Sequence, residues 1–478
     1  MTRSLPRATT RIATTALGFT VASLFGTSLA QTRPATSSGA LPAVEVVGRT
    51  ESGAYHAEEA EGAKTELPLR ELPQSVRTIT RQAIDDLGAV RLDDVLDYVG
   101  GVSRQNSFGG LWDNVAIRGL PGNENTGMAT LLNGFSANRG FNAPRDLAPI
   151  DRIEFLKGPA SALYGSSEPG GTLNMVSKRP LWRAANSIDL SLGSFGFWRG
   201  AFDASGPIGD QVAYRLNAAI ESRDGFRDFV DTERWIIAPA LTARLGSRTS
   251  IEYFGEFLQQ KTPLDRGVVA VGNRLGAIPR SRFLGEPADG AMEVDNRTHQ
   301  FVLTHAWSDQ WRSRLGVQYR ETSLQGFSTE ATALLADNTT LRRQRRYRDY
   351  RSDDTTVQAE LIGSVQAFGM SHEVLAGVET YRFEQDSLLL RVNPTAAAPY
   401  AINIYNPVYG QPQPVPLPNT DTLERQRGTA FYLQDAIRVA TDWRVVAGVR
   451  FDDVAQSLLN RRNGTTTDND PTATSPRL

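Results

Sequence analysis

From about residue 186 onward, apolar and polar side chains alternate along segments of about ten residues. One segment places Val212, Tyr214, Leu216, Ala218 and Ile220 on one face and mainly glutamine, arginine, asparagine and glutamate on the other. Successive side chains of a strand point to opposite faces of a sheet, so this period of two predicts β-strands. We expect about eleven such strands, each with one apolar and one polar face.

The connections between these segments also follow a pattern. Short turn-forming sequences, such as Ser205–Pro207 and Thr441–Asp442, alternate with long polar stretches near residues 259–296, 322–341 and 389–424. Short turns at one end and long loops at the other are typical of outer-membrane β-barrels, whose polar face lines the lumen and whose apolar face meets lipid. The interfacial girdles of such a barrel would be supplied by tryptophans near the strand ends, namely Trp235, Trp307, Trp311 and Trp443.

Residues 64–180 show a different pattern, which predicts a compact α/β domain. Thr80 precedes a helical segment that ends at Gly88, and a second short helix places Leu92, Val95, Leu96 and Val99 on one face. Further strands are predicted at 114–118, 129–132, 150–156 and 172–176, and a helical turn at 161–164.

The first thirty residues resemble an export signal. Three arginines precede an apolar stretch, which ends in the small-x-small sequence Ser28-Leu29-Ala30. We expect cleavage after Ala30, which leaves residues 31–63 as a mobile polar tail. This tail contains one apolar patch, formed by Ala43, Val44, Glu45, Val46 and Val47. The patch could add a strand to a partner's sheet edge, or it could be a chance strand-like segment in a disordered tail.

The amino-acid composition argues against several classes of function. Lys+Arg 51 against Asp+Glu 53 gives a net charge of −2, which does not favour nucleic-acid binding. The absence of cysteine excludes disulfides and thiolate sites, and four scattered histidines do not suggest a metal site. We find no catalytic motif and no cofactor-binding motif, so we expect the protein not to be an enzyme. One basic run, Arg342–Arg348, is interpreted as a strand end that faces lipid phosphates, an anionic ligand or only solvent.

Five segments of residues 71–180 resemble, in order, the plug domain of TonB-dependent siderophore receptors. They are Leu72-Pro73-Gln74-Ser75-Val76, Asn114-Val115-Ala116-Ile117-Arg118-Gly119, Leu132-Asn133-Gly134, Asp151-Arg152-Ile153-Glu154-Phe155-Leu156-Lys157-Gly158-Pro159, and the stretch from Ala162-Leu163-Tyr164-Gly165 to Ser177-Lys178-Arg179-Pro180. Near the other end of the chain, Tyr432-Leu433-Gln434-Asp435 and Gly448-Val449-Arg450-Phe451-Asp452 resemble a barrel strand pair of the same family.

The resemblance implies a fold and a function. The fold is an N-terminal α/β plug inside a transmembrane antiparallel β-barrel of the cell outer membrane, with 22 strands in the family. The domains would be a signal peptide (1–30), a flexible tail (31–63), the plug (64–180) and the barrel (181–478). The function would be import of a ferric siderophore, with outer-membrane lipid and the TonB energy-transducing complex as partners. The patch Ala43 to Val47 is then the candidate TonB box.

The resemblance also suggests site residues. Two plug loops that face the ligand in the family contain arginine and aromatic side chains suited to anionic, partly aromatic siderophores. The ligand-binding candidates are Arg104, Phe108, Trp112, Arg139 and Phe141; ordinary plug–barrel packing is the alternative. Arg118, Glu154 and Lys157 match a charged cluster that locks plug to barrel in the family; an ordinary solvated salt bridge is the alternative.

The sequence departs from the family in the barrel. The 298 residues from Leu181 to Leu478 are about half of what a 22-stranded barrel needs, so we expect a fragment or a truncated product that does not transport alone. Cobalamin, haem or an oligosaccharide are alternative cargoes. A passive porin, an adhesin-like barrel and a nonfunctional truncated barrel are the alternative functions.

Overall fold

The computed structural model describes residues 55–65, 67–121, 129–165, 169–395 and 399–478. All of these residues belong to one compact unit. The predicted signal peptide and the candidate TonB box at Ala43 to Val47 lie outside the described residues.

The N-terminal part of the chain forms a mixed sheet. Its strand order is β1-β7-β8-β5-β6, with β5 parallel to β8. The strands are β1 (Ser75–Thr80), β5 (Ala129–Leu132), β6 (Phe135–Ser136), β7 (Ile150–Lys157) and β8 (Gly171–Ser177). Their buried apolar side chains, among them Ile153, Phe155, Leu173 and Met175, form one core. The predicted strands at 129–132, 150–156 and 172–176 are therefore confirmed.

Short helices and a small second sheet complete this part. The helix α1 (Arg81–Asp86) begins where expected, because the Thr80 hydroxyl accepts a hydrogen bond from the Ala83 N–H at 3.4 Å. The second predicted helix is the 3-10 helix η3 (Leu92–Tyr98), and the predicted turn is α2 (Ser161–Tyr164). The remaining elements are η1 (Glu61–Ala63), η2 (Leu69–Glu71) and the sheet β2 (Val102–Arg104), β3 (Val115–Ile117) and β4 (Leu120–Pro121).

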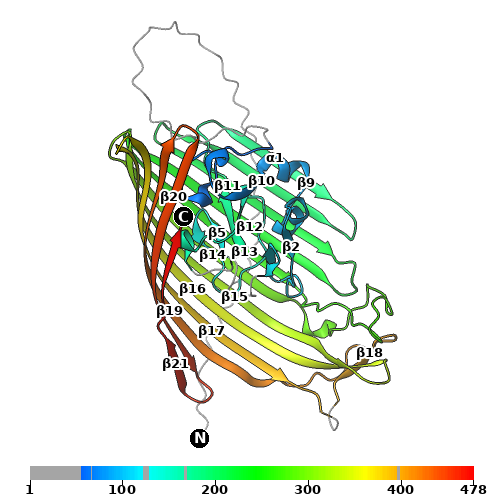
Figure 1. Ribbon diagram of the computed structural model, residues 1–478. Coiled ribbons are helices and arrows are strands. Elements are labelled where there is room, and N and C mark those ends of the chain that lie inside the picture. The colour runs from blue at the N-terminus through cyan, green and yellow to red at the C-terminus, as the bar shows by residue number, and fades with distance from the viewer. Residues whose placement is uncertain (1–54, 66, 122–128, 166–168, 396–398) are drawn as a thin grey trace, which may run out of the picture. The chain divides into compact units, whose positions relative to one another are not determined.

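The rest of the chain forms a 14-stranded sheet, which is antiparallel throughout and curved in Figure 1. Most neighbours in the sheet are neighbours in sequence, as in an up-and-down barrel. The strands are β9 (Ala185–Leu192), β10 (Trp198–Ile208), β11 (Val212–Asp224), β12 (Asp231–Leu245), β13 (Thr249–Thr262), β14 (Met292–Ala306), β15 (Trp311–Leu334), β16 (Thr340–Ala367), β17 (Met370–Val392), β18 (Ala401–Asn403), β19 (Leu417–Ala440), β20 (Trp443–Asn460), β21 (Thr465–Asn469) and β22 (Thr472–Arg477), with η4 (Pro287–Asp289) between β13 and β14. Within the described residues, no pairing joins β9 to β21 or β22, so this sheet is open.

One predicted loop is wrong. Residues 322–341 were expected to be a long loop, but β15 continues to Leu334 and β16 begins at Thr340. The two strands remain paired from Trp311↔Gly363 to Leu334↔Leu341. The apolar–polar alternation that identifies a strand depends on lipid on one side, so it disappears where a strand extends beyond the bilayer.

The two faces of the large sheet differ as the alternation predicted. On β11, the side chains of Ala213, Arg215, Asn217, Ala219 and Glu221 are buried. On the other face, large apolar side chains such as Ile220, Phe301 and Phe431 are exposed. Among the described residues, no helix has the length and apolar character needed to cross a bilayer.

Candidate functional site: the plug apex and the facing strands

The segment between β2 and β3 forms a tight loop that carries two of the predicted ligand-binding residues. The Ser107 carbonyl accepts hydrogen bonds from the N–H groups of Gly110, Leu111 and Trp112, at 3.1, 3.1 and 3.3 Å. Phe108 adopts a left-handed backbone conformation with φ 51°, which is uncommon for a residue other than glycine and often marks a functional loop. We call residues 105–114 the apical loop.

Four aromatic rings form a continuous column from the apical loop to the large sheet. Phe108 stacks on Trp112 with ring centroids 4.1 Å apart, and Trp112 lies 5.5 Å from Phe141. Phe141, in the next plug loop, stacks at 4.6 Å on Tyr350 of β16. The column therefore joins both predicted ligand loops to one barrel strand.

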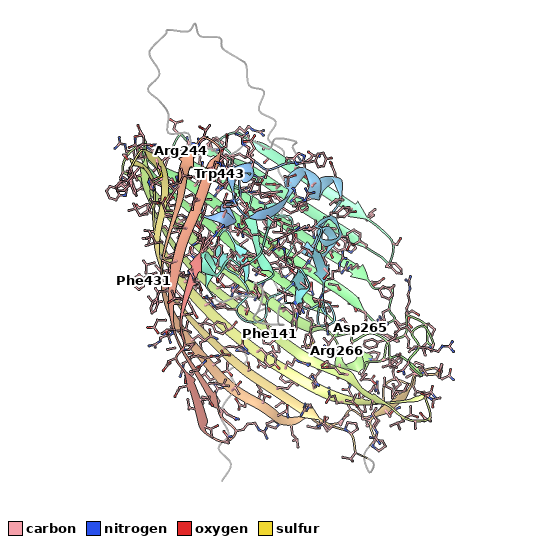
Figure 2. The ribbon with its side chains drawn as sticks, viewed as in Figure 1. Phe141, Arg244, Asp265, Arg266, Phe431 and Trp443 are labelled. Atoms are coloured by element: carbon pink, nitrogen blue, oxygen red, sulfur yellow. The ribbon has the colours of Figure 1, made fainter. Side chains whose placement is uncertain are left out.

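Guanidinium groups cover the outer end of the column. Arg266, from the loop that follows β13, lies 4.1 Å from the Phe108 ring centroid, and Arg348 of β16 lies 4.9 Å from it. Both arginines form ion pairs with Glu330 of β15, at 3.0 and 2.8 Å. Cations over aromatic faces are attracted by the ring quadrupole, so these contacts stabilise the arrangement. Figure 2 shows Arg266 and Asp265 beside one another.

The loop that carries Arg266 packs closely against the apical loop. Gly109 has φ +68°, and a Cβ placed on it would lie 2.7 Å from the backbone nitrogen of Asp265. Leu264 belongs to the same apolar cluster as Phe108 and Trp112. Asp265 is in turn held by an ion pair with Arg227. The apical loop and the loop that follows β13 therefore position each other.

The structure brings together three of the five predicted ligand-binding residues, namely Phe108, Trp112 and Phe141. Arg139 lies on the same side of β16, where it pairs with Asp354 at 3.0 Å and stacks on the Tyr381 ring at 3.7 Å. Arg104 points elsewhere and pairs with Asp97 at 2.5 Å. Their roles in ligand binding stay predictions.

Several members of the site were not identified from the sequence. Tyr350 and Glu330 come from two barrel strands and Arg266 from the loop after β13, so only strand register and loop packing bring them to the plug apex. The one available signal was the basic run Arg342–Arg348, which includes Arg348 but does not indicate which face each arginine occupies.

Asp113, next to Trp112, has an unusual environment. Burial raises the pKa of Asp113 to about 7, and nearby Asp93 acts in the same direction. The N–H of Arg145, which donates to the Asp113 carboxylate at 2.8 Å, acts against this rise. A carboxyl that titrates near neutral pH therefore lies directly beside the aromatic column.

Buried ion pairs join the plug to several strands of the large sheet. They are Lys64–Glu360 at 2.8 Å, Arg91–Glu221 at 2.8 Å, Arg145–Glu256 at 2.8 Å, Asp146–Arg199 at 2.7 Å and Asp146–Arg234 at 3.1 Å. Although burial opposes ionisation, the charges of Arg234 and Arg199 hold the pKa of Asp146 below its usual range. These pairs fix the plug against the strands.

The predicted lock residues lie in a different arrangement. Glu154 is fully buried and accepts hydrogen bonds from the N–H groups of Glu61 and Gly62 at 3.0 and 2.8 Å, so it holds η1 within the plug. Lys157 donates to the Gly100 carbonyl at 2.5 Å, and the Arg118 N–H donates to the Gly101 carbonyl at 2.7 Å. Each of these contacts is internal to the plug, and the lock assignment stays a prediction.

The outer face of the large sheet is apolar in its middle and carries tryptophan or charged side chains toward the strand ends, the order that a bilayer requires. Phe431, which is 59% exposed, lies in the middle of β19, whereas Trp443, 72% exposed, begins β20 beside the short turn (Figure 2). On β14, Arg297 pairs weakly with Glu321 at 4.0 Å on this face, and Trp307 follows the end of the strand. The ten residue steps from Arg297 to Trp307 correspond to about 24 Å for a strand tilted by about 45°, close to the apolar height of such barrels.

Comparison with known proteins identifies the family. A TonB-dependent receptor plug-domain model matches residues 68–172, and a TonB-dependent receptor-like β-barrel model matches residues 238–478. The chain belongs to the TonB-dependent receptor family. The family is an outer-membrane one, and the homologues of this receptor are transport receptors rather than enzymes.

Two relatives of this receptor are informative. It is 40% identical over 403 residues to the metal-pseudopaline receptor CntO of Pseudomonas aeruginosa, covering 84% of this chain and 56% of the relative. It is 29% identical over 431 residues to the ferrioxamine receptor of Yersinia enterocolitica, covering 86% of this chain and 59% of the relative. The chain thus spans somewhat more than half the length of these relatives.

A solved structure supports the fold. The siderophore receptor PiuA of Acinetobacter baumannii superposes with a TM-score of 0.80 at 20% identity, covering 89% of this chain and 65% of PiuA. At this level of identity the likeness concerns the fold of plug and barrel.

Proposed function

We propose that this receptor binds a ferric siderophore at the plug apex and imports it across the outer membrane. The observation that carries the proposal is the aromatic column Phe108–Trp112–Phe141–Tyr350, which is shared by two plug loops and one barrel strand and is covered by arginine. Aromatic and guanidinium groups suit ligands that are anionic and partly aromatic. Because plug and barrel both contribute, a ligand bound here would contact both parts.

Binding can be tested apart from transport. Trp112 lies inside the column, so a chelate that contacts the site should quench its fluorescence. The full chain in detergent would be titrated with a panel of ferric siderophores, and Trp112→Phe should remove the quenching. A panel in which no chelate changes the fluorescence would contradict the proposal.

We further propose that transport depends on TonB through the segment Ala43 to Val47. A strand-adding contact relies on backbone hydrogen bonds, so Val46→Pro should abolish uptake of radioactive iron by cells while chelate binding stays unchanged. Val46→Thr, which keeps the backbone donor, is the matched control and should retain uptake. Uptake that survives Val46→Pro would favour a passive pore.

The 40% identity to a metal-pseudopaline receptor favours a second candidate cargo within the same class. That relative is named for a metal chelate without restriction to iron. The titration panel should therefore include the same chelators loaded with nickel, zinc or cobalt. Equal binding of these complexes would widen the cargo from ferric siderophores to metal chelates in general.

A further inference from the structure

The basic run Arg342–Arg348 is divided between the two faces of β16. Tyr350, Ser352 and Asp354 contact plug residues, so even-numbered positions of this strand face the plug. Arg346 and Arg348 share this face. The odd-numbered side chains lie on the other face, where Tyr347 contacts Phe327.

Three arginines on the plug-facing side share one carboxylate. Glu330 forms ion pairs with Arg348 at 2.8 Å, Arg266 at 3.0 Å and Arg346 at 3.4 Å. Arg391 of β17 lies directly opposite Arg346 in the sheet and forms no ion pair among the described residues. Three guanidinium groups therefore share one carboxylate, and Arg391 adds a fourth positive charge beside Arg346. We call these five residues the arginine cluster.

This arrangement differs from a solvated strand end. The side chains of Glu330 and Arg348 are only 4% and 3% exposed, so the charges at the base of the cluster are largely removed from water. Like charges directly opposite each other on neighbouring strands are destabilising, as for Arg346 and Arg391. Such an excess of positive charge is relieved when an anion binds.

The cluster also remains accessible where a ligand would reach it. Arg266 and Arg346 are 28% and 20% exposed, and Arg266 lies over Phe108 at the end of the aromatic column. Planar guanidinium groups bind carboxylates through paired hydrogen bonds. The cluster is thus adjacent to the proposed chelate site and complementary to carboxylate groups.

We infer that the arginine cluster is a subsite for free carboxylate groups of the cargo, which makes the preferred cargo a metal chelate of net negative charge. The inference rests on the proposed function, because it concerns the same site. It places charge selection on the barrel wall, in Arg266, Arg346 and Arg391, and aromatic contact mainly on the plug.

The test compares ferric chelates of similar size that differ in net charge. The full chain in detergent is titrated with the ferric complexes of citrate and of other carboxylate chelators, and with neutral and cationic hydroxamate complexes. Anionic complexes should bind at least ten-fold more tightly, and their affinity should fall as salt rises. This part needs no variant, so it does not depend on a substitution that fails to fold.

A matched pair of variants then locates the effect. Arg346→Gln should weaken binding of the anionic chelates by about 10- to 100-fold, the range for one lost charge-assisted hydrogen bond. Arg351→Gln changes an arginine on the opposite face of the same strand, 69% exposed, and should change nothing. Heat-modifiable migration on gels checks that both variants fold.

The outcomes separate the two proposals. Equal affinity for anionic, neutral and cationic chelates, or equal behaviour of Arg346→Gln and Arg351→Gln, would overturn the carboxylate subsite while leaving chelate binding intact. Binding of no chelate of any charge would instead overturn the proposed function, and the subsite with it.

Discussion

At the residue scale, single buried carboxyls determine how the plug is held together. Glu154 accepts four hydrogen bonds, from the backbone of Glu61 and Gly62, from Asn174 at 2.9 Å and from Arg152 at 2.9 Å. Burial raises the pKa of Glu154, because few waters can stabilise its charge. Four donors converge on this one group, so its replacement leaves several of them without a partner.

We predict that Glu154→Gln loosens the segment 61–64. An amide can accept through only one atom, so at least one buried donor loses its acceptor, at a cost of about 1–3 kcal/mol. Hydrogen exchange of the Glu61 and Gly62 amides should accelerate by about 10- to 100-fold. Asp151→Asn, a partly exposed neighbour that pairs with the same Arg152, is the control. Unchanged protection in Glu154→Gln would show that Glu154 does not hold η1.

Asp113 should make the apical loop sensitive to pH. Its pKa is raised to about 7 in the folded protein, above about 3.9 when unfolded, so the folded state binds the proton more tightly. Asp113 therefore favours the folded loop fully below about pH 4, and this contribution is lost as pH rises through about 7. Fluorescence of Trp112, isolated by subtracting the Trp112→Phe signal, should change with a midpoint near pH 7. Asp113→Asn should abolish that transition, and a transition that persists would assign it to another group.

At the element scale, close contact between two loops fixes the site. The apical loop and residues 263–267 approach each other at Gly109, where backbone meets backbone. A side chain cannot be accommodated there by a rotamer change, because the neighbouring atoms belong to the main chain of Asp265.

Gly109→Ala should therefore separate these loops. The added Cβ clashes with Asp265 and also meets an unfavourable φ, so we expect a loss of about 1–3 kcal/mol and weaker chelate quenching of Trp112. Gly110 also has a positive φ, +85°, but a Cβ there meets nothing within 4 Å. Gly110→Ala thus carries the backbone strain alone and should cost about 1 kcal/mol. Identical titrations of the two variants would show that the contact with Asp265 is unimportant.

The sequence predicted elements better than it predicted the site. Alternation located the strands within the bilayer, because lipid outside and polar groups inside impose a period of two. It failed where β15 continues to Leu334 and β16 begins at Thr340, within the predicted loop. Phe108, Trp112 and Phe141, which the structure brings together, were predicted because they lie in two short plug loops of the family, and their role in ligand binding stays a prediction. Tyr350 and Arg266 were missed, because their approach to Phe141 and Phe108 depends on strand register and loop packing, which no local pattern encodes.

At the scale of the whole molecule, the outer face defines how the receptor sits in its membrane. Phe431 is exposed in the middle of its strand, and Trp443 is exposed at the start of the next strand, beside a short turn. The energetic cost of a charge on this face depends on its depth in the bilayer.

Phe431→Arg should destabilise the membrane-inserted chain by about 2–4 kcal/mol, whereas Trp443→Arg should cost about 0–1 kcal/mol. Urea titrations of the chain folded into lipid vesicles would measure both values. Equal costs at the two positions would contradict the assigned depth, and a larger cost for Trp443→Arg would reverse it.

The division of β16 between two faces has a consequence for how the receptor can vary. Arg346 and Arg348 face the plug, while Tyr347, Asp349 and Arg351 alternate with them on the other face. Residues 347, 349 and 351 can therefore change, and with them the outer surface of this strand, without changing the inferred carboxylate subsite. Conversely, substitutions at positions 346 and 348 can change the inferred cargo preference without changing the outer surface. The inferred cargo preference and the outer surface of β16 can thus vary independently.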